Sequence, residues 1–580
     1  MPEQGGTMVN STLRESPDRI QLLLHDGTLI LIMGVLAACG LIYEYLLSHY
    51  AGRILGAVET AIYAMIGLMI VSMGLGSLAA RVIKDPFTAF AWLEVVIAIL
   101  GITCILIIAA LVALTSLLPQ VVVDTFLLPP DLLPGGGFFA ALKKLAVASP
   151  YLFGFVLGFL IGMEIPLIAR VREELHGIHL MHNIGTIYGA DYIGAGIGAV
   201  IWVAIMLSMD VTQAAVLTAL ANLLAGLLFL WRYWSRIGYS TLLLGFHVLI
   251  LILAFAVHRS GEDWASSMTN LLYRDQVVFD QNTPYQHLTI TQRVLSGDIE
   301  PVYGFYINGR LQFSSHDEHI YHAMLVYPTM LVAERTEKIL IIGGGDGLAL
   351  RDVLKWDPTQ VDVIDLDQQV IEFFSAEEGA NPPYYQRALW QLNERAFSDE
   401  RVKLRYGDAF LEIDRLLEQG ELYDVIIIDL PDPGHPDLNR LYSVNFYARL
   451  GHLLTGGGAM ALQSTSPYHA KKAFLSIGRT VQEAGFRNVQ QYRQNVPSFG
   501  EWGWTIATKL GQTPRQRISA IDELPLHDGW ISKGLMLAAF EFPVGFFDDL
   551  DGIEINYLGS NRIYQYHQQA WQQEQGIYQK

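Results

Sequence analysis

The chain has 580 residues, of which 52% are hydrophobic, and a formal net charge of −19 at pH 7. This hydrophobic content excludes a wholly soluble protein, and the length allows two or three domains. The acidic balance argues against a nucleic-acid partner. The cysteines, Cys39 and Cys104, both lie in apolar stretches, so the sequence has no disulfide framework and no zinc-site pattern.

The apolar residues are concentrated after a polar N-terminal segment, residues 1–28. Seven stretches are long enough to cross about 30 Å of hydrocarbon, at 29–51, 58–82, 87–117, 147–170, 186–208, 211–234 and 240–257. We therefore predict a multi-span α-helical membrane domain over residues 29–258. Because the first stretch lacks a small-residue cleavage site, we expect a permanent anchor rather than a signal peptide.

Five acidic residues fall within these stretches, namely Glu44, Glu59, Glu94, Glu164 and Asp191. Intramembrane acids are costly and usually face a protein interior or a cavity. One interpretation is a cation path or an amine site. The other is interhelical hydrogen bonding or an interfacial position, and the sequence leaves both open.

Beyond His258 the composition becomes that of a soluble, acidic domain. Residues 259–316 contain alternating patterns and an Asn308–Gly309 turn signal, which predict a small β-rich subdomain. Over residues 317–510 strand and helix patterns alternate, which predicts a Rossmann-like α/β domain with a parallel sheet and helices on both faces. Residues 511–580 follow as a C-terminal extension.

The segment "KILIIGGGDGLALRDVLKW", residues 338–356, has the strand, glycine-rich turn and helix of a nucleotide-binding unit. No Lys-Ser/Thr pair follows the glycines, which disfavours a phosphate loop, and Asp346 would face the pyrophosphate of a dinucleotide. An acid suits a ligand with positive charge or hydroxyls, such as a sulfonium nucleoside. The loop by itself does not decide between these cofactor classes.

Acidic residues also follow the next three predicted strands. They are Asp365 and Asp367 in "VDVIDLD", Asp408 in "YGDAF", and Asp429 and Asp432 in "YDVIIIDLPDPGHPD". Ligands of open α/β sheets bind at the carboxyl ends of the strands. There, an acid after the second strand typically binds the ribose hydroxyls of a nucleoside. Asp408, after the third strand, could accept a hydrogen bond from an adenine amino group. Five acids are expected to converge on one crevice, namely Asp346, Asp365, Asp408, Asp429 and Asp432, although each taken singly is also typical of a helix cap.

Together, "INGRLQFSSHDEHIYHAMLVYP", "ILIIGGGDGLALRDVLKW", "VIDLD", "GDAF" and "YDVIIIDLPDP" resemble the polyamine aminopropyltransferases, the spermidine synthase family. The resemblance spans about residues 283–509 and implies a class I methyltransferase-like fold. The upstream "GLIYEYLLSHYAGRILG" and "GADYIGAGIGAV" resemble the transporter-like membrane domain of the membrane-fused bacterial type.

The resemblance implies a reaction. Family enzymes move the aminopropyl group of decarboxylated S-adenosylmethionine to a diamine, usually putrescine, and release 5'-methylthioadenosine. They need no metal and hold no permanent cofactor. The implied partners are a polyamine, the sulfonium nucleoside and the lipid bilayer, without nucleic acid, and a homodimer is left open.

The resemblance also implies site residues. On the amine side, Asp429 would accept the amine proton, Asp346 and Asp432 would hold ammonium ends, and Tyr321 and His322 would line the site. On the nucleoside side, it implies Gln286, Gly343, Gly345, Asp365, Asp408, Ala409 and Pro436.

This chain departs from the family pattern at three places. The usual D-S-S-D-P is D-L-P-D-P, with Leu430 and Pro431, and the usual ribose Glu is the shorter Asp365. Phe499 stands where a substrate-contacting Tyr is common, with Glu501 nearby as an additional acid. The acceptor amine is therefore left open, with putrescine as the first choice.

Two alternatives remain. The first is a polyamine transporter or sensor with a non-catalytic nucleoside- or amine-binding domain, against which the retained Asp429 and Asp432 favour an enzyme. The second is a methyltransferase that uses S-adenosylmethionine, against which Asp346 argues.

We expect a multi-pass protein of the bacterial inner membrane. With seven spans, the N-terminal segment and every second loop lie on the same side of the membrane. Eight basic residues fall on that side, namely Arg14, Arg19, Arg81, Lys84, Arg170, Arg172, Arg232 and Arg236. With seven spans, the positive-inside rule would place the enzyme domain outside the cell. The donor nucleoside is made in the cytosol, and on this ground we expect a cytoplasmic enzyme domain, against the charge distribution.

Overall fold

The computed structural model describes residues 19–55, 58–126, 136–176, 183–271, 273, 275–294, 300–377, 379–526 and 529–574. The chain divides into two compact units, residues 1–272, here the helical unit, and residues 273–580, here the α/β unit. The expected fold class, a set of apolar helices followed by an α/β domain, is confirmed.

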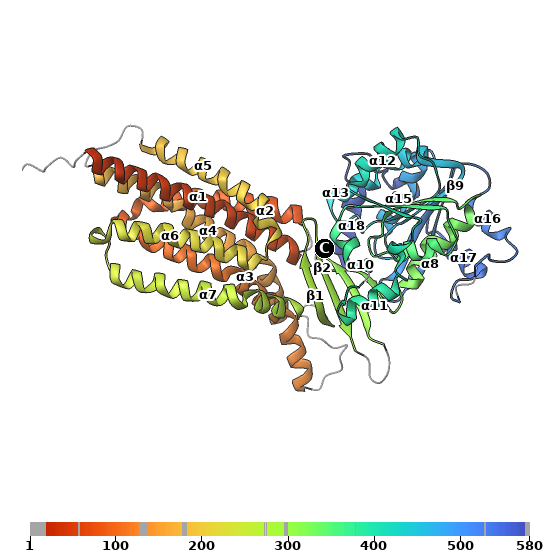
Figure 1. Cartoon of the computed structure of the whole chain (residues 1–580), viewed down its shortest axis with the longest axis horizontal. Coiled ribbons are helices and arrows are strands. Elements are labelled where there is room, and N and C mark those ends of the chain that lie inside the picture. The colour runs from red at the N-terminus through yellow and green to blue at the C-terminus, as the bar shows by residue number, and fades with distance from the viewer. Residues whose placement is uncertain are drawn as a thin grey trace, which may run out of the picture. The chain divides into compact units, whose positions relative to one another are not determined.

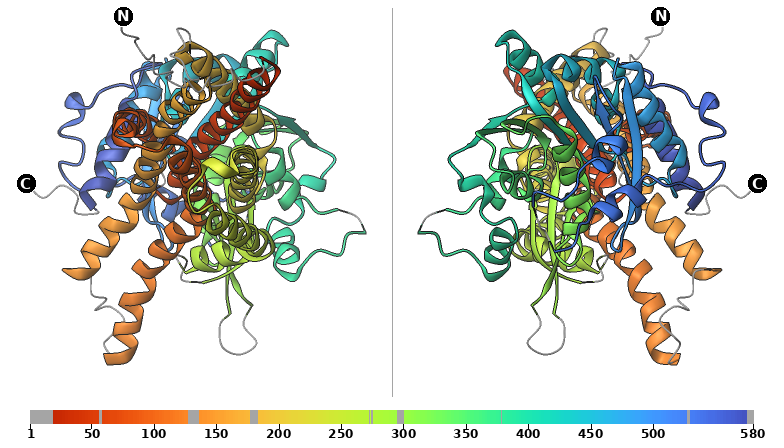
Figure 2. Two further views of the ribbon diagram at one scale, coloured as in Figure 1. Left: turned by 90° about the vertical axis from the view of Figure 1, so that its left-hand side faces the viewer. Right: turned by 90° about the vertical axis from the view of Figure 1, so that its right-hand side faces the viewer.

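Among its described residues, the helical unit contains seven long apolar helices (Figure 1): α1 (Arg19–Leu55), α2 (Val58–Ala79), α3 (Pro86–Phe126), α4 (Phe138–His176), α5 (Asn183–Ala204), α6 (Val211–Arg232) and α7 (Ser240–Asn270). Each is long and apolar enough to cross a membrane. The 41 residues of α3 span about 60 Å. The C-terminal end of α3 and the N-terminal end of α4 extend past the other helices of this unit (Figure 2).

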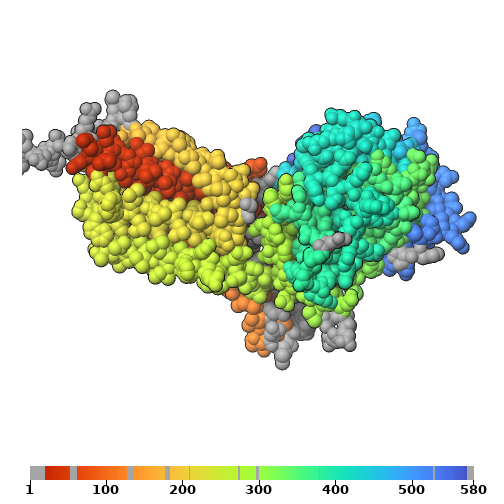
Figure 3. Space-filling model, viewed as in Figure 1, coloured from red at the N-terminus to blue at the C-terminus, as the bar shows by residue number. Residues whose placement is uncertain are grey.

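Glycines allow close contacts between these helices. A Cβ atom at Gly162 of α4 would overlap the Met73 carbonyl of α2, and one at Gly194 of α5 would overlap the Gly34 carbonyl of α1. Small residues at such contacts let helix backbones approach one another. Figure 3 shows α1, α5, α6 and α7 side by side along one face of the unit.

The helical unit extends beyond the boundary expected at residues 258 and 259. Helix α7 continues through the polar residues 258–267 and ends at Asn270. Polar side chains leave the backbone hydrogen bonds of a helix intact, and no proline interrupts this segment. Residues 259–270 therefore belong to the helical unit and not to the β-rich subdomain.

The α/β unit begins with a four-stranded antiparallel sheet in the order β1 (Gln276–Asn282), β2 (His287–Arg293), β3 (Val302–Ile307) and β4 (Arg310–Ser314). Asn308 and Gly309, with φ values of 50° and 76°, form the turn between β3 and β4. Positive φ at both turn positions favours an Asn-Gly pair. The predicted hairpin is confirmed.

A seven-stranded sheet follows, in the order β10-β11-β9-β8-β5-β6-β7. Its strands are β5 (Lys338–Gly343), β6 (Gln360–Asp365), β7 (Val402–Tyr406), β8 (Tyr423–Asp429), β9 (Leu454–Gln463), β10 (Asn488–Val496) and β11 (Gly500–Thr508). Strands β5 to β9 are parallel as predicted, whereas β10 and β11 form an antiparallel hairpin that the sequence analysis missed. Strand β10 is rich in Gln, Arg and Asn, so it lacks the apolar run of a buried strand.

Helices cover both faces of this sheet. Ile339 and Ile341 of β5 belong to one core with α8 (Glu318–Val332) and α9 (Leu348–Leu354). Leu340 and Ile342 belong to a second core with α12 (Ala409–Glu418), α14 (Val444–Leu453) and α15 (Lys471–Glu483). Successive strand side chains point to opposite faces, which explains this division. The four-stranded sheet packs on α10 (Gln368–Phe374) and α11 (Tyr384–Leu392).

The C-terminal segment, residues 511–580, belongs to the same compact unit. Ile518 of α16 (Pro514–Ser519) and Met536 of α17 (Lys533–Ala539) lie in the core with α8. Ile563 of α18 (Arg562–Glu574) lies in the core with α15. Because its apolar side chains complete both cores, this segment stabilises the fold.

Candidate active site

The glycine loop is held against the end of β8. Gly343 of β5 pairs with Asp429 of β8. Strands β6 and β7 lie on one side of β5, and β8 and β9 lie on the other side, so the strand order reverses between β5 and β8. A Cβ atom at Gly343, where φ is 81°, would overlap the Asp429 carbonyl oxygen. The Gly344 amide donates to the same oxygen at 3.0 Å. Ligands of open α/β sheets bind at such a switch point.

Four of the predicted amine-site residues lie together here. The Tyr321 hydroxyl donates to Asp429 Oδ1 at 2.7 Å, and His322 Nε2 lies 4.0 Å from Asp429 Oδ2. One polar atom each of His322, Asp346 and Asp429 lies within 4.8 Å of the others. We call Tyr321, His322, Asp346 and Asp429 the carboxylate cluster.

Burial and neighbouring charge set the protonation of the cluster. Burial raises the pKa of Asp429, and the His322 charge and the Tyr321 hydrogen bond oppose this rise. Burial also raises the pKa of Asp346, to about 6, against the attraction of His322. Two partly buried carboxylates close together favour a ligand that brings positive charge.

His322 is kept charged by a residue that the sequence analysis missed. Its Nδ1 lies 2.8 Å from Glu318 Oε2, and Arg351 donates to the same carboxylate at 2.8 and 3.1 Å. Burial alone would lower the pKa of His322, but the bond to Glu318 raises it to about 9. Burial would raise the pKa of Glu318, yet His322 and Arg351 lower it to about 2. The spacing of four residues on one helix was the available signal.

His322, Asp346 and Asp429 also have the residue types of a metal site. The bond to Glu318 raises the pKa of His322, which favours the protonated ring over the neutral ring that binds a metal. The two carboxylates can accept hydrogen bonds from the N–H donors of an ammonium group.

On the nucleoside side, Asp365 lies against the glycine loop. A Cβ atom at Gly345 would lie 2.8 Å from Asp365 Oδ2, and burial raises the pKa of Asp365 to about 7. Gln286 donates to Asp367 Oδ2 at 3.0 Å, and Thr283 donates to the same oxygen at 2.6 Å. Asp367, which had no assigned role, therefore fixes Gln286 next to the end of β6.

Asp408 has the role of a helix cap. Its Oδ1 accepts from the Phe410 amide at 3.0 Å, and its Oδ2 pairs with Arg440 at 2.7 Å. Ala409 begins α12, and Pro436 begins α13 (Pro436–Asn439). The ion pair ties the segment after α13 to the end of β7, so the predicted adenine residues lie in two segments linked by Arg440.

Among the described residues, one oxygen of Asp432 has a partner and the other has none. His567 Nε2 of α18 lies 3.2 Å from Asp432 Oδ2. Asp432 Oδ1 is buried and has no hydrogen-bond partner among the described residues. His567 was also missed, because nothing in the local sequence of α18 indicates a contact with a loop so distant in the chain.

The structure brings Phe499 to the cluster but not Glu501. The Phe499 ring lies 6.1 Å from Tyr321, and the Trp504 ring lies 5.7 Å from Tyr321. Glu501 pairs with Arg493 of β10. Side chains along a strand alternate between the two faces of a sheet. Glu501 and Trp504 are three residues apart on β11, so Glu501 points to the face opposite Trp504.

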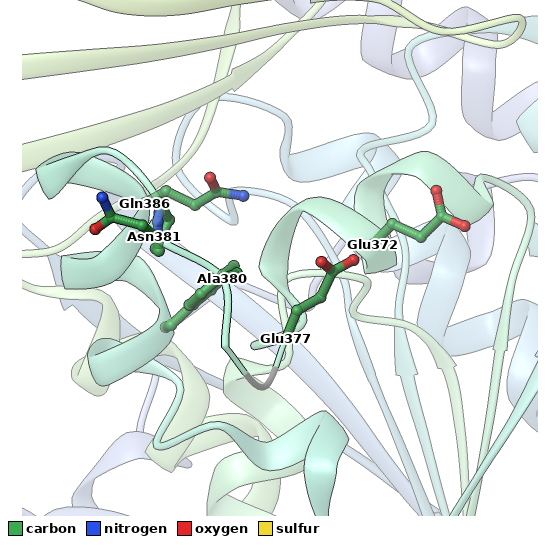
Figure 4. Close-up of a pocket in the computed structure, with 7 residues that line it drawn as sticks. Glu372, Glu377, Ala380, Asn381 and Gln386 are labelled. Carbon is green, nitrogen blue, oxygen red and sulfur yellow. The ribbon is translucent and has the colours of Figure 1, made fainter.

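Two cavities lie outside the carboxylate cluster. The first, of about 220 Å³, lies beside α10 and α11 and is shown in Figure 4. Its lining residues are Glu372, Glu377, Ala380, Asn381, Pro382, Gln386 and Trp390. The second, of about 420 Å³, is lined by residues that include Arg479 and Tyr557. Neither cavity is lined by a predicted site residue.

Residues 318–517 match the family described as the Spermine/spermidine synthase domain. The chain is 54% identical to a polyamine aminopropyltransferase of Shewanella oneidensis over 552 residues, which cover 95% of this chain and 96% of the relative. The chain belongs to the polyamine aminopropyltransferase family. The resemblance seen in the sequence is thus confirmed, and the protein is a transferase.

Two further proteins are similar to this chain at lower identity. A polyamine aminopropyltransferase of Oceanobacillus iheyensis is 31% identical, with 93% of this chain and 96% of the relative covered. A solved spermidine synthase in complex with the transition-state analogue AdoDATO is 23% identical, with a TM-score of 0.41, and covers 47% of this chain and 88% of its own. The alternative of a non-catalytic transporter or sensor is not favoured by these aminopropyltransferase relatives.

Proposed function

We propose that the protein transfers the aminopropyl group of decarboxylated S-adenosylmethionine to putrescine, with spermidine and 5'-methylthioadenosine as products. Asp429 takes a proton from the acceptor ammonium, and the lone pair freed on nitrogen forms a bond to the carbon next to sulfur as the carbon–sulfur bond breaks. Sulfur keeps the electron pair of that bond and becomes a neutral thioether. Positioning of two bound reactants supplies much of the rate.

The position of Asp429 carries this proposal. Tyr321 holds Oδ1 by a hydrogen bond, so the carboxylate is oriented at the end of β8 beside the glycine loop. Amines have pKa values near about 10, so the acceptor arrives as ammonium and needs a proton acceptor. A carboxylate within reach of the amine fulfils this role.

The other acids would hold the remaining charges. Asp346 and the free Oδ1 of Asp432 are acceptors for ammonium groups of donor and acceptor. Asp365, with Gly343 and Gly345 beside it, would take the ribose hydroxyls. Gln286, Asp408, Ala409 and Pro436 remain the proposed nucleoside contacts, and Phe499 lies beside the amine site.

The base assignment is tested by replacing Asp429 with asparagine. We expect Asp429→Asn to lower kcat by at least about 100-fold, because the amide accepts no proton. The measurement is release of methylthioadenosine from the full chain with the decarboxylated nucleoside and a panel of amines. Glu501→Gln is the matched control, because it also neutralises an acid but faces the other side of the sheet. Unchanged turnover in Asp429→Asn would remove Asp429 as the base, and turnover with another amine but not putrescine would reassign the acceptor.

We also propose that the seven helices anchor the protein in the bacterial inner membrane, with the α/β unit in the cytoplasm. Their length and apolar composition support the anchoring, and the cytosolic origin of the donor supports the sidedness. Fusions at residue 580 test the sidedness: a fluorescent protein should be bright and an alkaline phosphatase inactive. The reverse pattern would show that the charge distribution predicts the orientation correctly.

A further inference from the structure

Helix α8, which carries Tyr321 and His322, has an aspartate at its N-cap that does not cap it. An N-cap aspartate normally accepts a hydrogen bond from a backbone amide in the first turn of its own helix. The Asp317 side chain accepts no such bond from α8, although the residue is only 3% exposed. A buried carboxyl group needs hydrogen-bond donors from elsewhere.

The donors come from the turn between β10 and β11. The Ser498 amide donates to Asp317 Oδ2 at 2.6 Å, and the Ser498 hydroxyl donates to Asp317 Oδ1 at 2.9 Å. Both oxygens are thus bonded to one residue that lies 181 positions further along the chain. Two parallel bonds fix an orientation as well as a distance, so Asp317 clamps this turn to the start of α8.

The clamped turn carries an aromatic side chain of the amine site. Phe499 directly follows Ser498, and its ring centroid lies 6.1 Å from that of Tyr321 and 5.1 Å from that of Trp502. The Phe499 and Tyr321 rings meet edge to face, at 74°, which is a favourable geometry for such a pair. Tyr321 is also the residue that orients Asp429. The clamp and the proposed base therefore share one helix.

We propose that Asp317 is a positioning residue of the amine site, whose carboxyl group holds the β10–β11 turn so that Phe499 forms a fixed wall for the carbon chain of the acceptor. This inference rests on the proposed aminopropyl transfer. Methylene groups gain free energy by leaving water for an apolar surface. A surface that is already ordered loses less conformational entropy when the amine binds. Asp317 acts through Ser498 and Phe499 rather than on the amine.

The kinetic test uses the full chain in detergent and measures methylthioadenosine release. We expect Asp317→Ala to raise the KM for putrescine about tenfold, with kcat and the KM for the nucleoside unchanged. Asp317→Asn keeps an oxygen for the Ser498 amide and should remain close to the natural chain. His316→Ala, at the exposed neighbouring position, is the control. An equal rise in the alanine and asparagine variants would show that Asp317 attracts the ammonium by charge, which would overturn the proposal.

Ser498→Ala is a second variant, because Ser498 is exposed and its replacement leaves the backbone bond in place. It should raise the KM for putrescine by a smaller factor than Asp317→Ala. Added to Asp317→Ala it should cause no further change, because both substitutions break the same contact. Independent effects that multiply would show that the two residues do not act together, against the proposal.

Hydrogen exchange tests the clamp without turnover. The Ser498 amide should exchange slowly in the natural chain and at least about tenfold faster in Asp317→Ala. Slow exchange retained in Asp317→Ala, or faster exchange with an unchanged KM for putrescine, would overturn the proposal. A natural chain that releases no methylthioadenosine would overturn the proposed function instead, and equilibrium dialysis of labelled putrescine would then replace the KM measurement.

Discussion

At the scale of single residues, Asp429 illustrates how several weak local signals meet at one point. The apolar strand before it places it at the sheet edge, and the glycine loop approaches its backbone. Tyr321 and His322 then reach it from α8. A partly buried carboxylate that is oriented by Tyr321 and lies next to a histidine with a raised pKa is suited to share a proton with an amine.

The pKa of Asp346 predicts a pH dependence of amine binding. Burial raises this pKa to about 6, so Asp346 is charged above that pH and neutral below it. We expect the KM for putrescine to rise as pH falls through about 6, because the ammonium loses an attractive charge. Steady-state kinetics across this range measure the effect. In Asp346→Asn the KM should be higher throughout and lack this step, and a step that persists there would assign it to another group.

The Glu318–His322 pair predicts a pH dependence of stability. His322 has a folded-state pKa of about 9, above its usual 6.5, so its contribution is complete below 6.5 and is lost as pH rises through 9. The pKa of Glu318 is lowered from its usual 4.5 to about 2, so its contribution to folding stability is complete above pH 4.5 and is lost as pH falls through 2. Breaking a buried pair costs about 3–5 kcal/mol.

We therefore expect Glu318→Gln to lower the melting temperature most between pH 4.5 and 6.5, with a smaller difference near pH 9. Thermal unfolding followed by near-UV circular dichroism measures this difference. Glu412→Gln is the control, since Glu412 pairs with the exposed Arg415 rather than with a histidine. If Glu318→Gln lowers the melting temperature by the same amount at every pH, Glu318 stabilises the fold only by packing.

At the scale of elements, the candidate active site is completed by segments that lie far apart in the chain. The β10–β11 hairpin supplies Trp504 and Phe499 against Tyr321. Helix α18 supplies His567 to Asp432, although α18 lies outside the matched family region, 318–517. The C-terminal helix thus positions a residue of the loop after β8.

We expect His567→Ala to raise the KM for the amine about tenfold with little change in kcat, since a hydrogen bond to a carboxylate is worth about 1.5–3 kcal/mol. His567→Gln keeps a donor and should restore part of the affinity. Gln569→Ala, at an exposed position of the same helix, is the control. An equal loss in the alanine and glutamine variants would indicate a packing role.

At the scale of the whole molecule, the two units have separate cores. No residue of the helical-unit core belongs to any of the described cores of the α/β unit. Units with their own hydrophobic cores generally fold alone. The proposed reaction uses residues of the α/β unit only.

We therefore expect residues 273–580, expressed alone, to be soluble and to release methylthioadenosine at a rate comparable with that of the full chain. The same fragment with Asp429→Asn is the control for contaminating activity. A folded fragment without activity would show that the helical unit contributes to the active site.

The sequence by itself determined the features that depend on local pattern. Apolar length predicted the seven helices, the Asn-Gly pair predicted the β3–β4 hairpin, and the alternation of strand and helix patterns predicted the parallel strands. Of the five acids expected in one crevice, Asp346 and Asp429 lie together in the carboxylate cluster, whereas Asp408 pairs with Arg440. Each of these follows from residues close together in the chain. The end of α7 was mispredicted because a change to polar residues does not by itself end a helix.

Only the tertiary structure decided which distant side chains meet. Glu501 is close to Phe499 in sequence, yet strand alternation turns it to the other face of the sheet, where it pairs with Arg493. Arg351 and His567 reach Glu318 and Asp432 only after helices pack on the sheet. Such contacts depend on register and packing between separate elements, which no local pattern specifies.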